Sequence, residues 1–223
     1  MQNKTDKYSF ILKPEVVFDF SVDDEIGRVK YTTKKNDWYK ENGYIPKYPN
    51  AIEQKLESNG DVTEADIEKA VSDEFDKEEY DQEAAPICEN WYEIETTFFK
   101  NLKTLNLPTQ DRYHICLTKY GVGGSYGYPN EIQLNLGRKE KAHITIAHEI
   151  VHLTIEPLIK KYNIEHWTKE RLVNLIINRF FPENQSLQKD PENAEQISEI
   201  FNKKFPDIKK IIKQVSELEK QNK

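Results

Sequence analysis

The sequence is poor in cysteine, and its two cysteines lie far apart. Among 223 residues only Cys88 and Cys116 are cysteines, and they do not form a CxxC pair. A disulfide framework and a thiolate zinc ribbon both require more cysteines, so both are excluded. One bridge between these two residues is an alternative, but two free thiols are the expected state.

Long apolar runs and a surplus of basic residues are also missing. The apolar run at residues 10–12 is too short for the core of a signal peptide, and no apolar stretch reaches membrane-spanning length. The 32 Lys and Arg residues are outnumbered by 39 Asp and Glu residues, which gives a net charge of −7. General nucleic-acid binders usually carry a basic surplus. We therefore expect no nucleic-acid partner, no membrane partner and a cytoplasmic location.

The chain does contain enough apolar and aromatic residues to build a core. Hydrophobic residues make up 37% of it, and 12 Tyr, 10 Phe and 3 Trp are too many for a wholly disordered chain. The length suffices for one good-sized domain or two small ones.

Composition divides the chain into three parts. Residues 1–49 mix aromatic and β-branched residues with charges, and they predict short strands at residues 16–20 and 28–32. Residues 50–86 form an acidic, helical accessory segment, and residues 87–223 carry the motifs that matter for function.

The acidic segment predicts two short helices. Residues 50–83 contain 13 acidic residues and three lysines, a net charge of −10. Asn50 with Glu53, and Thr63 with Asp66, are typical of helix N-terminal caps. We expect both helices to face solvent, as charge-rich segments usually do.

The third part predicts a small sheet among helices. Apolar residues three or four apart predict a helix over residues 87–105. Strands are predicted at residues 112–120 and 131–136, joined as an antiparallel pair by a loop whose glycines supply positive φ. Further helices are predicted at residues 140–155, 168–181, 192–204 and 207–220. The expected fold class is α+β, with a small antiparallel or mixed sheet packed on helices.

Residues 148–152 read His-Glu-Ile-Val-His, an HExxH motif between apolar flanks. Residues four apart share one face of a helix, so the imidazoles of His148 and His152 can bind one metal ion. Neutral imidazole is a good ligand for Zn²⁺. Glu149 lies beside His148, where its carboxylate can accept a proton from an activated water molecule. The motif therefore predicts a zinc site with Glu149 as general base.

Two histidines leave a zinc site incomplete, so a third ligand has to come from another residue. Glu156 is excluded because positions 148, 152 and 156 climb about 12 Å along one helix axis. Pro157 is also expected to move Glu156 away from helical backbone angles. Glu170 fits, since it lies in the first turn of a helix that Thr168 is expected to cap. Glu165 is the alternative third ligand.

At this point the sequence resembles the gluzincin metallopeptidases, in which HExxH lies on one helix and a glutamate on the following helix completes the zinc site. The resemblance covers residues 110–181 and suggests a minimal member of the class. It implies that His148, His152 and Glu170 bind zinc and that Glu149 is the base in peptide-bond hydrolysis. Residues 87–223 would then form a zincin-like catalytic domain whose sheet edge holds an extended peptide or protein substrate.

The hydrolysis also needs a group that stabilises the oxyanion. His166, Tyr162 and Tyr126 are the candidates, because each can donate a hydrogen bond. His143 is about 140° around the helix from His148 and should face away from the metal. His114 is expected to be an ordinary strand residue. Gln133 and Asn135, on the polar face of their strand, are candidates for lining the cleft.

Two other interpretations remain open. Asn174 stands four residues after Glu170, where thermolysin-like members have an aspartate that orients a ligand histidine. This pattern also resembles small intracellular HExxH proteins of bacterial regulatory and phage systems, so the alternative is a zinc-binding regulatory or interaction protein with little general proteolysis. Residues 1–86 could also be an inhibitory pro-segment, with an acidic residue or Cys88 occupying the zinc.

Overall fold

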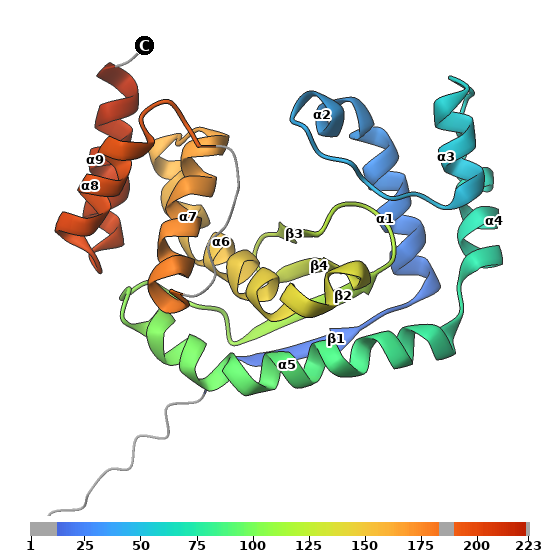
Figure 1. Cartoon of the computed structure of the whole chain (residues 1–223), viewed down its shortest axis with the longest axis horizontal. Helices are drawn as coiled ribbons and strands as arrows, with labels where there is room; N and C mark the ends of the chain where they lie inside the picture. Colours follow the sequence, from blue (N-terminus) through green and yellow to red (C-terminus); the bar gives the residue numbers. More distant parts are fainter. Residues whose placement is uncertain (1–12, 183–189, 222–223) are drawn as a thin grey trace, which may run out of the picture.

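The computed structural model of the protein describes residues 13–182 and 190–221 (Figure 1). The apolar run at residues 10–12 lies outside this part. The elements are β1 (Glu15–Asp19), α1 (Val22–Lys34), α2 (Asn36–Glu41), α3 (Asn50–Glu57), α4 (Glu64–Glu74), α5 (Lys77–Lys103), β2 (Arg112–Thr118), β3 (Gly124–Gly127), β4 (Glu131–Asn135), the 3-10 helix η1 (Leu136–Lys141), α6 (Ala142–Tyr162), α7 (His166–Phe180), α8 (Ala194–Lys204) and α9 (Ile208–Gln221). The expected α+β class is confirmed.

The four strands form one mixed sheet in the order β1-β2-β4-β3. β1 and β2 are parallel, β2 and β4 are parallel, and β3 runs antiparallel to β4. Since successive side chains point to opposite faces, one face presents the apolar residues. These are Val16, Phe18, Tyr113, Ile115, Leu117, Ile132 and Leu134.

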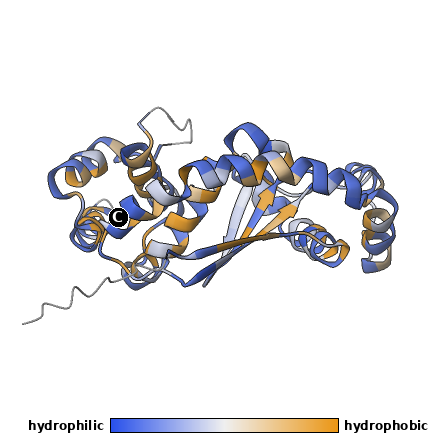
Figure 2. Cartoon of the chain, turned by 90° about the horizontal axis from the view of Figure 1, so that it is seen from below, coloured by the Kyte–Doolittle hydropathy of each residue, from blue (hydrophilic) through white to orange (hydrophobic). Residues whose placement is uncertain are grey.

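Helices α5 and α6 cover the apolar face of the sheet and form the main core with it. Trp91 and Phe98 of α5 and Ile146 and Ile150 of α6 are completely buried there. In Figure 2 hydrophobic colour lies on the strands and on parts of the helices, and hydrophilic colour covers much of the remaining helix surface. Helices α7, α8 and α9 extend the same core beyond the end of α6.

A second, smaller core lies at the other end of the molecule, between α1, α3 and α4. Its buried members are Val29, Ile52, Ile67, Ala70, Val71 and Tyr120. Thr63 and Asp66 form the expected capping box of α4. Asn50, however, is the first residue of α3 and does not cap it through its side chain. The acidic helices bury their apolar residues in this core, so only their other side faces solvent.

The strand predicted at residues 28–32 is wrong, because these residues belong to α1. Ser21 caps that helix by accepting a hydrogen bond from the backbone N–H of Asp24. Glu25, Arg28, Val29 and Thr32 are its buried residues, and they follow the helical period. The β-branched composition of the segment favoured a strand, but burial of one helical face decided the outcome.

The predicted connection between residues 112–120 and 131–136 is also wrong. The two strands are parallel, and the loop between them contains β3, which supplies the antiparallel pairing to β4. Gly121 does adopt a positive φ of 77°. A parallel neighbour needs a connection that returns the chain to the same end of the sheet, and β3 is part of that return.

The three parts expected from the composition are not structurally separate. β1, from residues 1–49, pairs with β2, and the boundary expected after residue 86 falls inside α5. Helix α5 begins ten residues earlier than predicted because the Asp76 side chain caps it. Pro86 is accommodated in its interior.

Two expectations about the later helices are corrected as well. Helix α6 continues through Pro157 to Tyr162, so Glu156 keeps a helical position. Helix α7 begins at His166 after Glu165, and Thr168 is a buried residue inside it rather than its cap. Both cysteines are free, as expected. None of the helices in the described ranges has the length and apolar character needed to cross a membrane.

Candidate metal centre

The HExxH motif lies in the middle of α6, in the buried part of that helix. Its apolar neighbours, which include Ala147, Ile150 and Val151, are completely buried and hold the helix against the sheet. His148 and His152 are one helical turn apart, and their Nε2 atoms are 3.0 Å from each other. The apolar flanks are thus buried against the sheet, and both imidazoles lie on one face of the helix, as the sequence predicted.

Glu170 completes a group of three ligand atoms. It reaches the two histidines from α7, with its Oε2 atom 3.4 Å from His148 Nε2 and 3.3 Å from His152 Nε2. Ligand atoms at about 2.0–2.1 Å from a tetrahedral zinc are separated by about 3.3 Å. The three edges of the triangle therefore have the size that one zinc ion requires. Two imidazoles and one carboxylate are also a donor set that zinc accepts.

The electrostatics of these ligands suit a cation. Burial alone would raise the pKa of Glu170, but the His152 and His148 imidazoles hold it well below the usual range. Burial lowers the pKa of His152 to about 4, so its imidazole is neutral near neutral pH. At His148 burial lowers the pKa, but the carboxylates of Glu170 and Glu149 outweigh it and raise the pKa, so a metal ion would displace a proton from this imidazole. A neutral imidazole and an ionised carboxylate are the protonation states in which these side chains bind metal.

Glu149 lies beside this triangle and is not part of it. Only 6% of Glu149 is exposed, and burial raises its pKa to about 7. The neighbouring His148 opposes the shift and the charge of Glu170 adds to it. A carboxylate that titrates near 7 can exchange protons at neutral pH, which is the property of a general base.

β3 brings the sheet edge next to Glu149. A side-chain carbon placed on Gly124 would lie 2.7 Å from Glu149 Oε1 and 2.6 Å from Thr145 Cγ2. Only glycine leaves room for this close approach of strand and helix. The glycine-rich loop, which the sequence analysis interpreted as a connection, therefore forms one wall of the site.

Tyr126, on the same strand, contacts the cluster through its ring. The phenol ring stacks on the imidazole of His152 at a centroid distance of 4.8 Å and an angle of 14°. Its hydroxyl donates to Glu156 Oε2 at 2.8 Å and accepts from Lys169 Nζ at 3.1 Å. The hydroxyl hydrogen is thus used in the bond to Glu156, the residue that the sequence analysis excluded as a metal ligand because of its position along the helix.

The other two candidate oxyanion donors have different positions. His166, in the first turn of α7, lies with Nδ1 3.9 Å from Glu170 Oε1, and burial lowers its pKa. Tyr162 lies in the last turn of α6, about 15 Å along the axis from His152. The structure brings His166 to the cluster and leaves Tyr162 away from it.

Tyr44 was missed by the sequence analysis. Its hydroxyl is 3.4 Å from His166 Nε2. Burial raises its pKa to about 12, and the charges of Glu170 and Glu149 contribute to this shift. The phenol therefore remains protonated and lies within the electrostatic field of the ligand and of the base. No spacing relates Tyr44 to the motif, because more than a hundred residues separate them along the chain.

The remaining candidates lie outside the cluster of described ligand atoms. Glu165 is exposed at the N-terminus of α7, and Cys88 lies half-buried on α5. Asn174 is buried on α7 one turn after Glu170. His114 is a residue of β2, as expected.

Gln133 and Asn135 do not face the cluster either. They alternate with Ile132 and Leu134, whose side chains point toward α6, so they lie on the opposite face of the sheet. Asn135 is used structurally, because its amide donates to the backbone oxygens of Lys119 and Tyr120.

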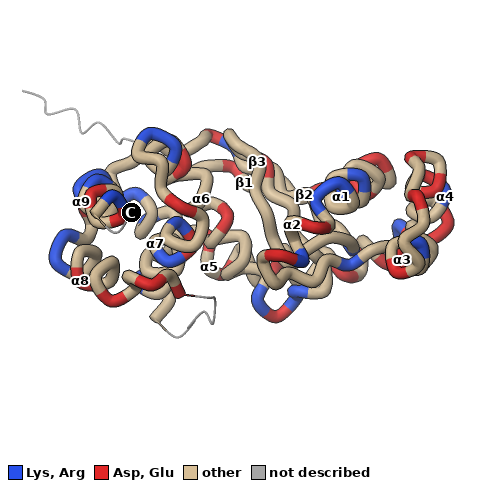
Figure 3. Tube along the Cα trace, turned by 90° about the horizontal axis from the view of Figure 1, so that it is seen from above, with Lys and Arg blue, Asp and Glu red and all other residues tan. Residues whose placement is uncertain are grey.

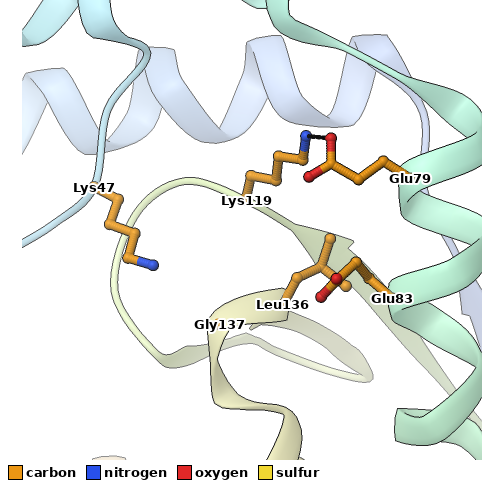
Figure 4. Close-up of a pocket in the computed structure, with 6 residues that line it drawn as sticks. All are labelled: Lys47, Glu79, Glu83, Lys119, Leu136 and Gly137. Carbon is orange, nitrogen blue, oxygen red and sulfur yellow. Dashed lines mark hydrogen bonds and ion pairs between the residues drawn. The ribbon is translucent and has the colours of Figure 1, made fainter.

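A pocket elsewhere on the surface is lined by Lys47, Glu79, Glu83, Lys119, Leu136 and Gly137 (Figure 4). Lys119 pairs with Glu79 across it, and Glu83 pairs with Lys139. No member of the metal cluster lines this pocket, and its carboxylates are neutralised by lysines. The His148, His152 and Glu170 group is therefore the site on which a functional argument rests. No protein-family model, curated protein or solved structure matches this chain.

Proposed function

We propose that the chain is a zinc-dependent peptidase of the gluzincin type. The observation that carries the proposal is the triangle of His148, His152 and Glu170, whose edges of 3.0, 3.4 and 3.3 Å match the ligand spacing of a tetrahedral zinc ion. Glu149 beside the triangle supports hydrolysis, because metal binding alone would not require a buried carboxylate in that position.

Zinc held there would act as a Lewis acid on a water molecule and on the carbonyl of the scissile bond. Glu149 accepts the proton of the attacking water and delivers it to the leaving amine. The substrate class that follows is a peptide or a protein.

Tyr44 and His166 supply hydrogen-bond donors at the same place. The high pKa of Tyr44 keeps its O–H protonated, and the 3.4 Å contact with His166 holds the two side chains together. His166 therefore remains the candidate for oxyanion stabilisation, with Tyr44 as its hydrogen-bonding neighbour, whereas Tyr162 lies too far along α6 to contribute.

The test combines metal analysis with peptide cleavage. We expect wild type to hold one zinc per chain and the His148→Ala variant to hold none. The Glu149→Gln variant should keep the zinc and lose cleavage of a peptide library. His143→Ala, on the same helix, is the matched control and should keep both properties.

Three outcomes separate this proposal from its alternatives. Zinc retained by His148→Ala would contradict the proposed metal site. Undiminished cleavage by Glu149→Gln would contradict the proposed role of Glu149 as general base. Stable zinc binding without cleavage of any peptide would favour the alternative of a zinc-binding regulatory or interaction protein.

A further inference from the structure

Two arginine side chains lie directly on the glycine loop that leads into β3. A side-chain carbon placed on Gly121 would overlap the guanidinium group of Arg28, and one placed on Gly123 would overlap that of Arg138. Arg28 comes from α1 and Arg138 from η1. Two positive charges from distant parts of the chain therefore meet at the start of the edge strand.

Lys47 adds a third cation at the same place. Its backbone forms two hydrogen bonds with Gly121, at 2.9 and 2.8 Å. A side-chain carbon placed on Gly137 would lie 2.9 Å from Lys47 Nζ, so the ammonium group reaches the residue before Arg138. In Figure 4 the side chain of Lys47 points toward the hollow, which has a volume of about 310 Å³. We call Arg28, Lys47 and Arg138 the basic cluster.

The positive charge of the basic cluster is not cancelled by acidic neighbours. Gly137 also borders a second hollow, of about 410 Å³, at residues 137–141. Each acidic residue that lines the two hollows has a lysine beside it, in an ion pair or along the chain. These are Glu79 with Lys119, Glu83 with Lys139, and Glu140 with Lys141. Within the described ranges, no carboxylate forms an ion pair with a member of the basic cluster.

Arg28 is the buried member of the cluster. Only 5% of it is exposed, and its Nη1 atom donates to Ser125 Oγ of β3 at 2.9 Å. Its Nε and Nη2 atoms are buried and have no acceptor among the described residues. Glu25, one turn earlier on α1, accepts instead from the Tyr80 hydroxyl and from the backbone N–H of Lys119. Buried donors without an acceptor indicate that an acceptor from outside the chain completes the site.

The basic cluster lies on the path that an extended peptide would take. β3 is an edge of the sheet, and its first residue, Gly124, is the one that contacts Glu149. A peptide that pairs with the open edge of β3 continues past Gly124 toward the guanidinium of Arg138, and Lys47 bridges to the same edge just before it. Because a strand advances about 3.3 Å per residue, a substrate side chain about two to four residues from the scissile bond meets the cluster.

The charges of the metal centre do not oppose an acidic side chain at this position. Glu170 carries one negative charge, but Lys169 Nζ lies 3.6 Å from its Oε1 atom, and a zinc ion in the site would add two positive charges. At the other end of β3, Glu156 is paired with Lys160. Glu149 is the remaining carboxylate beside the strand, and the three cations outweigh it.

We propose that the basic cluster is the subsite that binds an acidic side chain of the peptide substrate, to one side of the scissile bond. This inference rests on the proposed peptidase function and names its substrate class, which is peptides with aspartate or glutamate near the cleaved bond. Guanidinium groups bind carboxylates through paired N–H donors, and the ammonium group adds a point charge. Two of the three cations precede residue 87, so residues 1–86 contribute to binding, in contrast to the role of an inhibitory pro-segment.

The experiment measures peptide binding without cleavage. Zinc-loaded Glu149→Gln protein is titrated calorimetrically with acetyl-X-X-Ala-Ala-Leu-Ala-Ala-amide and acetyl-Ala-Ala-Leu-Ala-Ala-X-X-amide, in which X is Glu, Gln or Lys. The direction of the peptide along β3 decides which end meets the basic cluster. In that series we expect the Glu peptide to bind about tenfold more tightly than the Gln peptide, and the Lys peptide to bind most weakly. Added salt should reduce this advantage.

Variants then assign the preference to the basic cluster. In the same background, Arg138→Gln and Lys47→Gln should each reduce the advantage of Glu over Gln to about threefold, and Arg138→Glu should abolish it. Lys209→Gln is the matched control, because Lys209 is exposed on α9, at the end of the molecule opposite α1 (Figure 1). It changes the net charge by the same amount and should leave the preference unchanged. Zinc content and circular dichroism verify that each variant is folded and loaded.

No binding of any peptide, equal binding of the Glu and Gln peptides in both series, or a full Glu preference in Arg138→Gln would each overturn the inference. Failure of the proposed function gives a different result. In that case zinc is not held, or the wild type does not cleave, while the preference for Glu and its dependence on Arg138 persist.

Discussion

The ring of Tyr126 orients one ligand of the candidate metal centre. The ring lies flat on the imidazole of His152, and its hydroxyl is anchored between Glu156 and Lys169. Groups that hold a ligand in position contribute to metal affinity although they do not touch the metal.

Replacing Tyr126 separates the contribution of its ring from that of its hydroxyl. Tyr126→Leu removes the flat surface against His152, and we expect zinc affinity to fall about 10- to 100-fold. Tyr126→Phe keeps the stack and loses only the contacts with Glu156 and Lys169, so its zinc affinity should stay within about threefold. Competition with a chromophoric chelator measures the zinc affinity of both variants. An equal loss of affinity in the two variants would contradict the proposal that the ring orients His152.

The two thiols differ in their surroundings, which leads to a residue-scale prediction. Burial, with smaller contributions from acidic neighbours, raises the pKa of Cys116 to about 12, and burial also raises the pKa of the half-buried Cys88. Only about one Cys116 thiol in ten thousand is then ionised at pH 8. Alkylation followed by mass spectrometry should label Cys88 first, and Cys116 only after denaturant is added. Labelling of Cys116 before Cys88 in the native protein would contradict this burial.

At the scale of elements, the decisive contact is that between β3 and α6. Gly124 leaves no space for a side chain between the strand and Glu149. The edge strand therefore limits where the Glu149 side chain can lie. A side-chain carbon placed on Gly127, at the other end of the same strand, would lie 3.5 Å from Glu131 Cβ, which is an ordinary contact distance.

Adding a methyl group to each glycine tests this contact. Gly124→Ala should destabilise the protein by about 1–3 kcal/mol and reduce peptide cleavage, because strand and helix have to move apart. Gly127→Ala should leave both almost unchanged. Urea unfolding and cleavage assays measure the two effects. A Gly124→Ala variant with wild-type activity would show that the position of β3 does not matter to Glu149.

At the scale of the whole molecule, the three candidate ligands come from two different helices. His148 and His152 come from α6 and Glu170 from α7, so an ion bound by all three binds only the folded chain. The acidic residues of α3 and α4 lie at the end of the molecule away from α7 (Figure 3).

Binding to the folded state alone predicts a stabilisation that depends on zinc concentration. At a free zinc concentration of about 100 times Kd, the free energy of unfolding should rise by about 2.7 kcal/mol. For a chain of this size that corresponds to an increase in Tm of about 5–10 °C. Calorimetry with and without a chelator measures the shift. His148→Ala should show none, and an equal shift in that variant would place the metal elsewhere.

The local part of the site was predictable from the sequence. The spacing of His148 and His152 requires only the helical period, and the apolar flanks require only that one face of the helix be buried. Glu170 was also identified correctly as the residue that meets the histidines, because a helix following α6 has to pack back on it. Local periodicity determines these features before any long-range contact is known.

Only the tertiary structure decided which distant residues complete the site and how the strands are ordered. Tyr44 reaches the cluster because β1 pairs with β2 and Lys47 pairs with Gly121. The parallel pairing of β2 with β4 likewise depends on the path of β3 between them. Contacts of this kind depend on the packing of elements far apart in the chain, and no period in the sequence records them. The sequence by itself thus determined a helix with two histidines on one face and Glu149 beside them, and the tertiary structure determined which distant residues surround them.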